Sequence, residues 1–188
     1  MPKSWPAWLG LLLGLAALAA ALQLPASEVE QWRHAARWTA RCGFFLFLIA
    51  YSARPLSQLA PTTLTRAMMR QRRYWGLGFA ASHTVHLFAF VTYFRLADIP
   101  APVPVLIGGG LGYALLYAMA LTSNRWGIRT LGRNWKRLHS FGIHYIWLIF
   151  AFDYISRSFQ PETRAMDMAF SALLLGALGL RIAAQRKT

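Results

Sequence analysis

Six apolar segments alternate with polar segments along the chain. A transmembrane helix needs about 20 predominantly apolar residues, and each of these segments approaches that length. The pattern predicts an all-α polytopic membrane protein, a six-transmembrane-helix bundle that forms a single domain over residues 1–188. We expect the helices at about 8–24, 42–59, 74–94, 105–121, 138–155 and 165–183.

The polar segments predict how the helices are joined. Residues 25–40 have the composition of a polar connector, and 62–73 and 123–137 that of basic loops. Pro55 should kink or end the second helix because proline lacks an amide hydrogen. The first segment follows Lys3 as in a signal peptide. We expect it to be retained as a helix, because an even number of helices fits the charge distribution below.

Composition supports the membrane assignment and limits the partners. The chain is 56% hydrophobic and only 14% charged, whereas soluble domains carry about 25% charged residues. The net charge of +14 comes from basic residues placed between apolar segments, so we interpret them as topology signals and lipid contacts rather than a nucleic-acid surface. With both termini cytoplasmic, 14 of the 20 Lys and Arg residues lie on the inner side.

Histidines are the candidate chemistry of this chain. Cys42 is the one cysteine, so neither a disulfide within the chain nor a cysteine-based metal cluster can form. Four of the five histidines lie in two apolar segments: His83, His86, His139 and His144. Ionisable residues inside a membrane are costly and usually functional. Haem is favoured over a bare metal ion because carboxylates are scarce and aromatic residues are plentiful.

Depth and angle suggest which histidines share an iron. At 1.5 Å per residue, His83 lies roughly 13 Å and His86 roughly 18 Å from the inner face. His139 and His144 lie roughly 6 Å and 13 Å from it. Equal depth favours His83 with His144 as the haem-iron ligands. His83 and His86 share a helix face, whereas His139 and His144 point about 140° apart, which argues for one haem rather than two.

Three motifs resemble the ferric-reductase-like transmembrane domain family. They are TARCGFFLFLIAYSARPL (39–56), RRYWGLGFAASHTVH (72–86) and MALTSNRWGIRTLGRNWKRLH (119–139). The member type that they resemble most is the haem-binding membrane subunit of the bacterial periplasmic methionine-sulfoxide reductase system. The resemblance implies a six-helix bundle in the bacterial inner membrane, with b-type haem between the third and fifth helices.

By motif position, the resemblance makes His86 and His139 the alternative ligands. The family's second fifth-helix histidine would stand at residue 152, which is Phe152 here. The usual outer pair is therefore broken, and the haem count is one or two. Arg72, Arg73 and Arg137 are candidates to pair with haem propionates.

The predicted function is electron transfer by a subunit rather than by a complete enzyme, so we assign no catalytic residue. The chain has no Gly-x-Gly-x-x-Gly motif and no room for a flavin or nicotinamide domain. Electrons would come from a cytoplasmic flavin reductase or from quinol, and would leave to a periplasmic redox partner. The alternative is a non-redox small transporter or assembly protein with structural or metal-binding histidines. Against this alternative, Asp153 is the only other plausible buried carboxylate, and we expect it near the outer edge.

Overall fold

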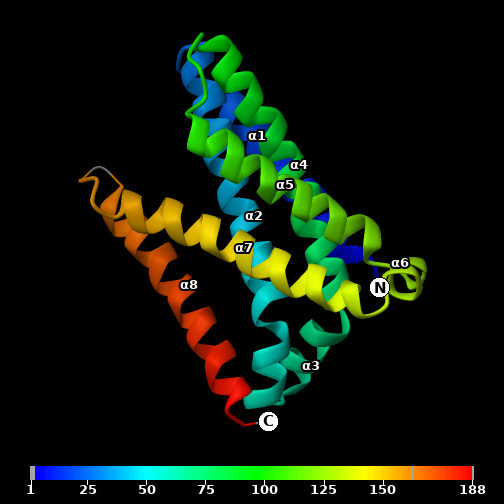
Figure 1. Cartoon of the computed structure of the whole chain (residues 1–188). Helices are drawn as coiled ribbons and strands as arrows, with labels where there is room; N and C mark the ends of the chain where they lie inside the picture. The colour runs from blue at the N-terminus through cyan, green and yellow to red at the C-terminus, as the bar shows by residue number, and fades with distance from the viewer. Residues whose placement is uncertain (1–2, 162, 188) are drawn as a thin grey trace. The chain divides into compact units, whose positions relative to one another are not determined.

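The computed structural model describes residues 3–161 and 163–187, and the regular structure in these ranges is α-helical throughout (Figure 1). This confirms the all-α class. The helices are α1 (Trp5–Leu22), α2 (Glu28–Leu59), α3 (Thr63–Arg70), α4 (Arg72–Leu96), α5 (Val103–Thr122), α6 (Arg125–Leu131), α7 (Arg133–Arg157) and α8 (Arg164–Gln185).

The chain divides into two compact units. Unit 1 comprises Met1–Ala50 and Ala67–Val103, and unit 2 comprises Tyr51–Arg66 and Pro104–Thr188. Unit 1 therefore holds α1, the first part of α2 and α4. Unit 2 holds the last turns of α2 with α5, α6, α7 and α8. The predicted single domain over residues 1–188 stays a prediction.

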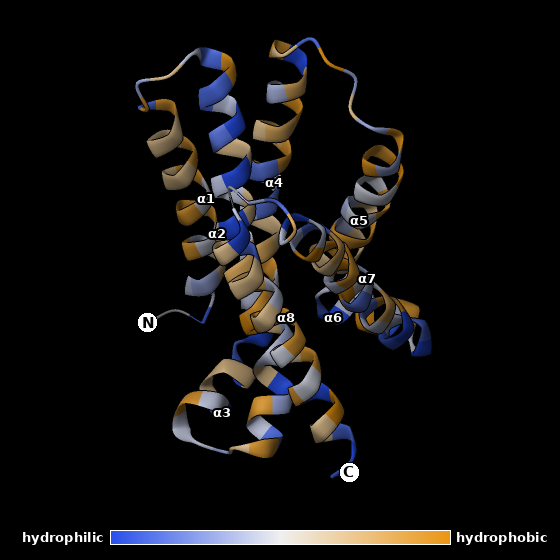
Figure 2. Ribbon diagram, turned by 90° about the vertical axis from the view of Figure 1, so that its left-hand side faces the viewer, coloured by the Kyte–Doolittle hydropathy of each residue, from blue (hydrophilic) through white to orange (hydrophobic). Residues whose placement is uncertain are grey.

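Four helices in the described part of the chain are long and apolar enough to cross a membrane: α1, α4, α5 and α8. Figure 2 shows α1 mostly in the colours of apolar residues, whereas the N-terminal half of α2 is largely hydrophilic. The other two predicted spans fall within α2 and α7. The structure therefore supports a helical membrane protein, and the count of six spans stays a prediction.

The predicted connector at 25–40 is wrong, because α2 already begins at Glu28. The Ser27 hydroxyl accepts a hydrogen bond from the Glu30 amide at 3.4 Å, as an N-cap does. Residues 28–42 contain neither proline nor glycine. Polarity alone does not stop a helix, and Glu, Gln, Ala and Arg favour one.

Helix α2 continues through Pro55 and ends at Leu59. One further expectation of irregular structure is corrected. The predicted basic loops each contain a short helix, α3 and α6. Thr62 and Thr65 cap the start of α3 reciprocally through their hydroxyls and amides. The Asn124 side chain accepts from the Gly127 amide at 2.7 Å and caps α6.

Small residues bring α1 and α4 together in unit 1, where Figure 1 shows them side by side. A Cβ atom at Gly10 would overlap the backbone of Gly78, and one at Gly78 would overlap the Pro6 carbonyl. Close backbone approach at small residues spaced four apart is typical of packed membrane helices. Trp5 and Trp75 close one end of this contact, with ring centroids 5.1 Å apart.

Aromatic residues and side-chain hydrogen bonds join the helices of unit 2. Tyr154 of α7 stacks on Phe170 of α8, with ring centroids 4.7 Å apart. The Trp147 indole donates to the Leu174 carbonyl at 3.1 Å. The Tyr145 hydroxyl donates to the Gly108 carbonyl of α5, also at 3.1 Å. These contacts fix the helix that carries His139 and His144.

Candidate functional site

A column of rings runs along one face of α4. Phe79, His83, His86 and Phe90 follow one another with ring centroids 4.4, 5.1 and 5.9 Å apart. A spacing of three or four residues places side chains on the same helix face. The structure therefore confirms that His83 and His86 share a face, and it surrounds them with aromatic rings.

The first part of α2 faces this column through residues spaced four apart. Thr39 contacts His86, and Gly43 lies against the ring of His83. Phe47 lies at Phe79, with ring centroids 5.5 Å apart. A Cβ atom at position 43 would overlap the His83 imidazole. Only glycine at this position therefore leaves room for the ring.

The hydrogen bonds of Thr39 indicate the tautomer of His86. The fully buried Thr39 hydroxyl donates its one proton to the Ala35 carbonyl at 2.6 Å. Its oxygen lies 3.3 Å from His86 Nδ1, so Nδ1 must carry the proton and donate. The other nitrogen, Nε2, then keeps its lone pair, which is the arrangement of a metal-ligating histidine whose second nitrogen is hydrogen-bonded.

His139 is held on both ring nitrogens by unit 2. Its ring stacks on Trp135 at 4.0 Å between centroids. Nδ1 lies 3.1 Å from the Trp135 carbonyl, which can only accept, so Nδ1 donates. Nε2 lies 3.3 Å from the Ser123 hydroxyl. To bind iron through Nε2, His139 would have to lose its contact with the Ser123 hydroxyl.

His144 is bound by the protein through Nδ1. This nitrogen donates to the Ser140 carbonyl at 2.6 Å, which leaves the lone pair on Nε2. The His144 ring packs edge-on against Tyr51, with centroids 5.9 Å apart. His139 and His144 thus contact different neighbours, as their predicted angle requires.

The four candidate histidines are divided between the two units. His83 and His86 belong to unit 1, and His139 and His144 belong to unit 2. The ligand pairs His83 with His144 and His86 with His139 therefore stay predictions. The residues that the structure describes contain no group of three or more His, Cys, Asp or Glu side chains arranged to hold a metal ion.

The three arginines proposed for haem propionates differ in their surroundings. Arg72 is half-buried and donates from Nε to the Ala50 carbonyl at 3.1 Å. Arg73 is exposed and lies 5.5 Å from the Tyr74 ring centroid. Arg137 is exposed on α7. The structure does not test a role in binding propionates for any of them.

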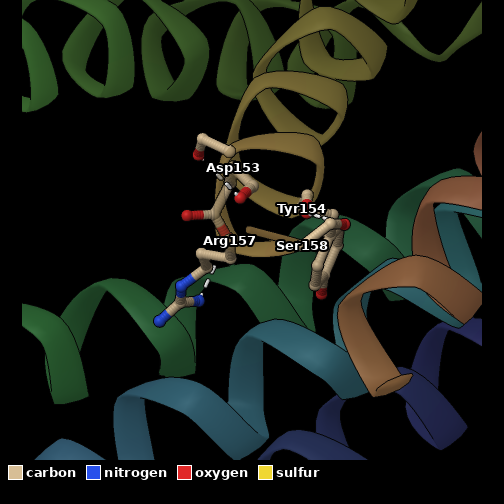
Figure 3. A network of polar contacts seen from close by, with 5 residues as sticks. Asp153, Tyr154, Arg157 and Ser158 are labelled. Atoms are coloured by element: carbon tan, nitrogen blue, oxygen red, sulfur yellow. Dashed lines mark hydrogen bonds and ion pairs between the residues drawn. The ribbon is translucent and has the colours of Figure 1, made fainter. Parts of the chain in front are cut away.

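Phe152 and Asp153 lie in the last turns of α7, where the resemblance would place a second histidine. Phe152 is 76% exposed. Asp153 is exposed too and pairs with Arg157 at 3.2 Å (Figure 3). The expectation that Asp153 is buried is wrong. Asp167 on α8 is the buried carboxylate, at 2% exposure, and its Oδ2 has no hydrogen-bond partner among the described residues.

Sequence reasoning missed the residues that support the histidines. Thr39, Gly43 and Tyr51 all lie on α2. Thr39 falls in the segment expected to be a connector, and Gly43 and Tyr51 fall in the second predicted helix. The signal that could have found them is the four-residue spacing of 39, 43 and 47. It becomes informative only once residues 28–59 are recognised as one helix.

Comparison with known proteins finds MsrQ subunits among the relatives of this chain. The protein-methionine-sulfoxide reductase heme-binding subunit MsrQ of Yersinia pseudotuberculosis serotype O:1b (strain IP 31758) is 28% identical over 157 residues, covering 76% of each chain. The MsrQ of Yersinia pestis (strain Pestoides F) is 28% identical over 157 residues, covering 76% of this chain and 75% of its own. No family model and no solved structure matches. The resemblance predicted from the motifs is therefore confirmed, since this chain is similar in sequence to the MsrQ heme-binding subunits.

Proposed function

We propose that this chain is a b-type haem-binding subunit of the bacterial inner membrane, with both termini cytoplasmic, that carries electrons to a periplasmic methionine-sulfoxide reductase. Two points support the proposal. Relatives that cover three quarters of the chain are named as heme-binding subunits of such a reductase. Four apolar helices are long enough to cross a bilayer.

The observation that carries the proposal is the contact of His86, a ligand of the alternative pair, with Thr39. Its Nδ1 faces the Thr39 hydroxyl at 3.3 Å, which leaves Nε2 to bind a metal. A bound haem would supply one-electron redox chemistry at its iron. The chain would hold the iron through histidine, orient the imidazole through Thr39, and exclude water with Phe79 and Phe90.

The ligand pair is proposed from depth and motif. His83 with His144 is the first choice, and His86 with His139 is the alternative. The ring geometry favours one member of each pair, because His86 and His144 both keep the Nε2 lone pair. We propose one haem. A second haem would require that both histidine pairs bind iron. Arg72, Arg73 and Arg137 are proposed to neutralise its propionates.

The electron donor is proposed to be a cytoplasmic flavin reductase or quinol. Basic residues are concentrated in the segments assigned to the inner side, where they would attract an acidic or phosphate-bearing donor.

An optical spectrum of the purified full-length protein tests the proposal. We expect a Soret band and an α-band that sharpens on reduction. Each candidate histidine is then replaced by Ala, with His34→Ala as the control, because His34 is the histidine outside the candidate set. Loss of the bands in H83A and H144A alone would select the first pair, and loss in H86A and H139A alone would select the second. A wild-type protein that binds no haem would contradict the function.

A further inference from the structure

A cavity of about 120 Å³ lies between the last turns of α2 and the last turns of α8, within unit 2. It exceeds the ~10–15 Å³ that one water molecule needs. Its lining residues are Arg54, Pro55, Gln58, Arg181, Ala184 and Gln185. None of the histidines discussed above lines it, so it is separate from the candidate haem ligands.

The lining combines two buried apolar residues with two arginines. Pro55 and Ala184 are the buried apolar residues. Arg181 is half-buried, and Arg54 is exposed at the rim. The remaining lining side chains, Gln58 and Gln185, are neutral amides, so the cavity has a charge of +2 and no carboxylate. This arrangement suits an anion that carries several acceptor oxygens.

Tyr51 holds Arg181 in place. Pro55 has no amide hydrogen, so the Tyr51 carbonyl four residues earlier loses its helical donor. Arg181 Nη1 approaches that carbonyl at 3.5 Å, and the guanidinium lies 4.7 Å from the Tyr51 ring centroid. A guanidinium has five N–H donors in a planar fork. The Tyr51 carbonyl thus contacts Nη1 of Arg181, and the Tyr51 ring contacts one face of its guanidinium. These two contacts orient the Arg181 side chain.

Neither arginine of the cavity forms an ion pair with another side chain in the described residues. The ion pairs there join Arg33 to Glu30 and Arg157 to Asp153. Two guanidinium groups at one cavity repel each other unless an anion lies between them. Within residues 3–161 and 163–187, no carboxylate pairs with either arginine, so an anion bound in the cavity would balance its charge.

We propose that this cavity binds a phosphate group. Paired guanidinium forks match the oxygens of phosphate through bidentate hydrogen bonds, and the amide of Gln58 can donate to a further oxygen. The phosphate comes from one of two sources, an anionic phospholipid head group or soluble phosphate. The cavity lies at the end of α8, where a candidate membrane span ends and head groups are found.

The experiment uses delipidated full-length protein in a non-ionic detergent and native mass spectrometry of its adducts. The probes are dioleoyl phosphatidic acid, dioleoylglycerol and inorganic phosphate. The first two have identical acyl chains and differ in the phosphate. Arg54→Gln and Arg181→Gln remove one charge each. Arg186→Gln is the matched control, because it removes one exposed charge from the end of the same helix outside the cavity.

We expect a phosphate-bearing probe to bind the wild-type protein and R186Q alike. R54Q and R181Q should each weaken it about tenfold or more, the effect of losing a charge-assisted bidentate contact. If phosphatidic acid binds and inorganic phosphate does not, the phosphate comes from a lipid. If inorganic phosphate binds and R54Q and R181Q weaken its binding equally, the phosphate is soluble. If R181Q does not fold, R54Q and Gln58→Glu test the proposal instead. Both residues are exposed, and both substitutions should weaken phosphate binding. Equal binding of dioleoylglycerol, unchanged binding in R54Q, or no phosphate adduct overturns the proposal.

Discussion

The Thr39 hydroxyl shows how one proton can determine the chemistry of a neighbouring side chain. Its proton is committed to the Ala35 carbonyl within its own helix. Toward His86 it can only accept, so it selects the tautomer that keeps the Nε2 lone pair. His144 reaches the same state through the Ser140 carbonyl. His139 differs, because both of its ring nitrogens face oxygen atoms of the protein.

Replacing Thr39 with Val tests this role. Valine keeps the shape but removes the acceptor, so His86 loses the hydrogen bond that orients it. Loss of such a supporting contact typically costs about 10–100-fold in metal affinity. If His86 belongs to the ligand pair, haem should transfer at least about tenfold more readily to excess apomyoglobin, followed by the Soret band. If His83 and His144 hold the iron, the transfer should not change.

Thr92→Val is the matched control for this substitution. The Thr92 hydroxyl donates to the Phe88 carbonyl on the same helix at 2.9 Å, as Thr39 does to Ala35. Its haem transfer should equal that of the wild-type protein. Equal transfer from T39V and T92V would show that Thr39 does not support the ligand.

The packing of α1 on α4 depends on which glycines of α4 contact the backbone of α1. Gly78 and Gly76 are two residues apart on α4, but a Cβ at Gly78 would overlap the Pro6 carbonyl, whereas one at Gly76 meets nothing within 4 Å. The same substitution should therefore have opposite effects at these two positions.

We expect Gly78→Ala to destabilise the protein by about 1–3 kcal/mol, since overpacking forces α1 and α4 apart. Gly76→Ala should stabilise it by about 0.5–1 kcal/mol, because alanine loses less backbone entropy in a helix. Unfolding in detergent, followed by tryptophan fluorescence, measures both. A G78A protein as stable as the wild type would contradict the packing of α1 on α4.

Proline within α2 illustrates how a tertiary contact overrides a local rule. Pro55 should kink or end the helix, and α2 runs four residues beyond it to Leu59. The carbonyl that proline leaves without an amide donor, that of Tyr51, is approached by Arg181 of α8. The helix therefore continues where another helix supplies the missing donor.

At the scale of the whole molecule, the distribution of positive charge predicts orientation. Cytoplasmic segments of membrane proteins carry an excess of Lys and Arg. A green fluorescent protein fused after Lys187 should therefore fluoresce, and alkaline phosphatase fused there should be inactive. Fusions in the connector 97–102 should give the reverse pattern. An active phosphatase at the C-terminus would overturn the predicted topology.

The long apolar runs let the sequence predict α1, α4, α5 and α8 to within a few residues, because burial in a membrane requires length and hydrophobicity that composition reveals directly. The shorter and more polar helices were missed. In α3, α6 and the first half of α2, helix formation depends on capping and propensity, which a hydropathy pattern does not report.

The sequence by itself determined that this is a helical membrane protein with four histidines in two of its segments, and the motifs around them identified its relatives. Only the tertiary structure decided what each histidine contacts: Thr39 and Gly43 at α4, and Ser123, Trp135 and Tyr51 at α7. The physical reason is that a residue's type and spacing are local properties, whereas the protonated nitrogen of an imidazole is set by neighbours that are distant in sequence.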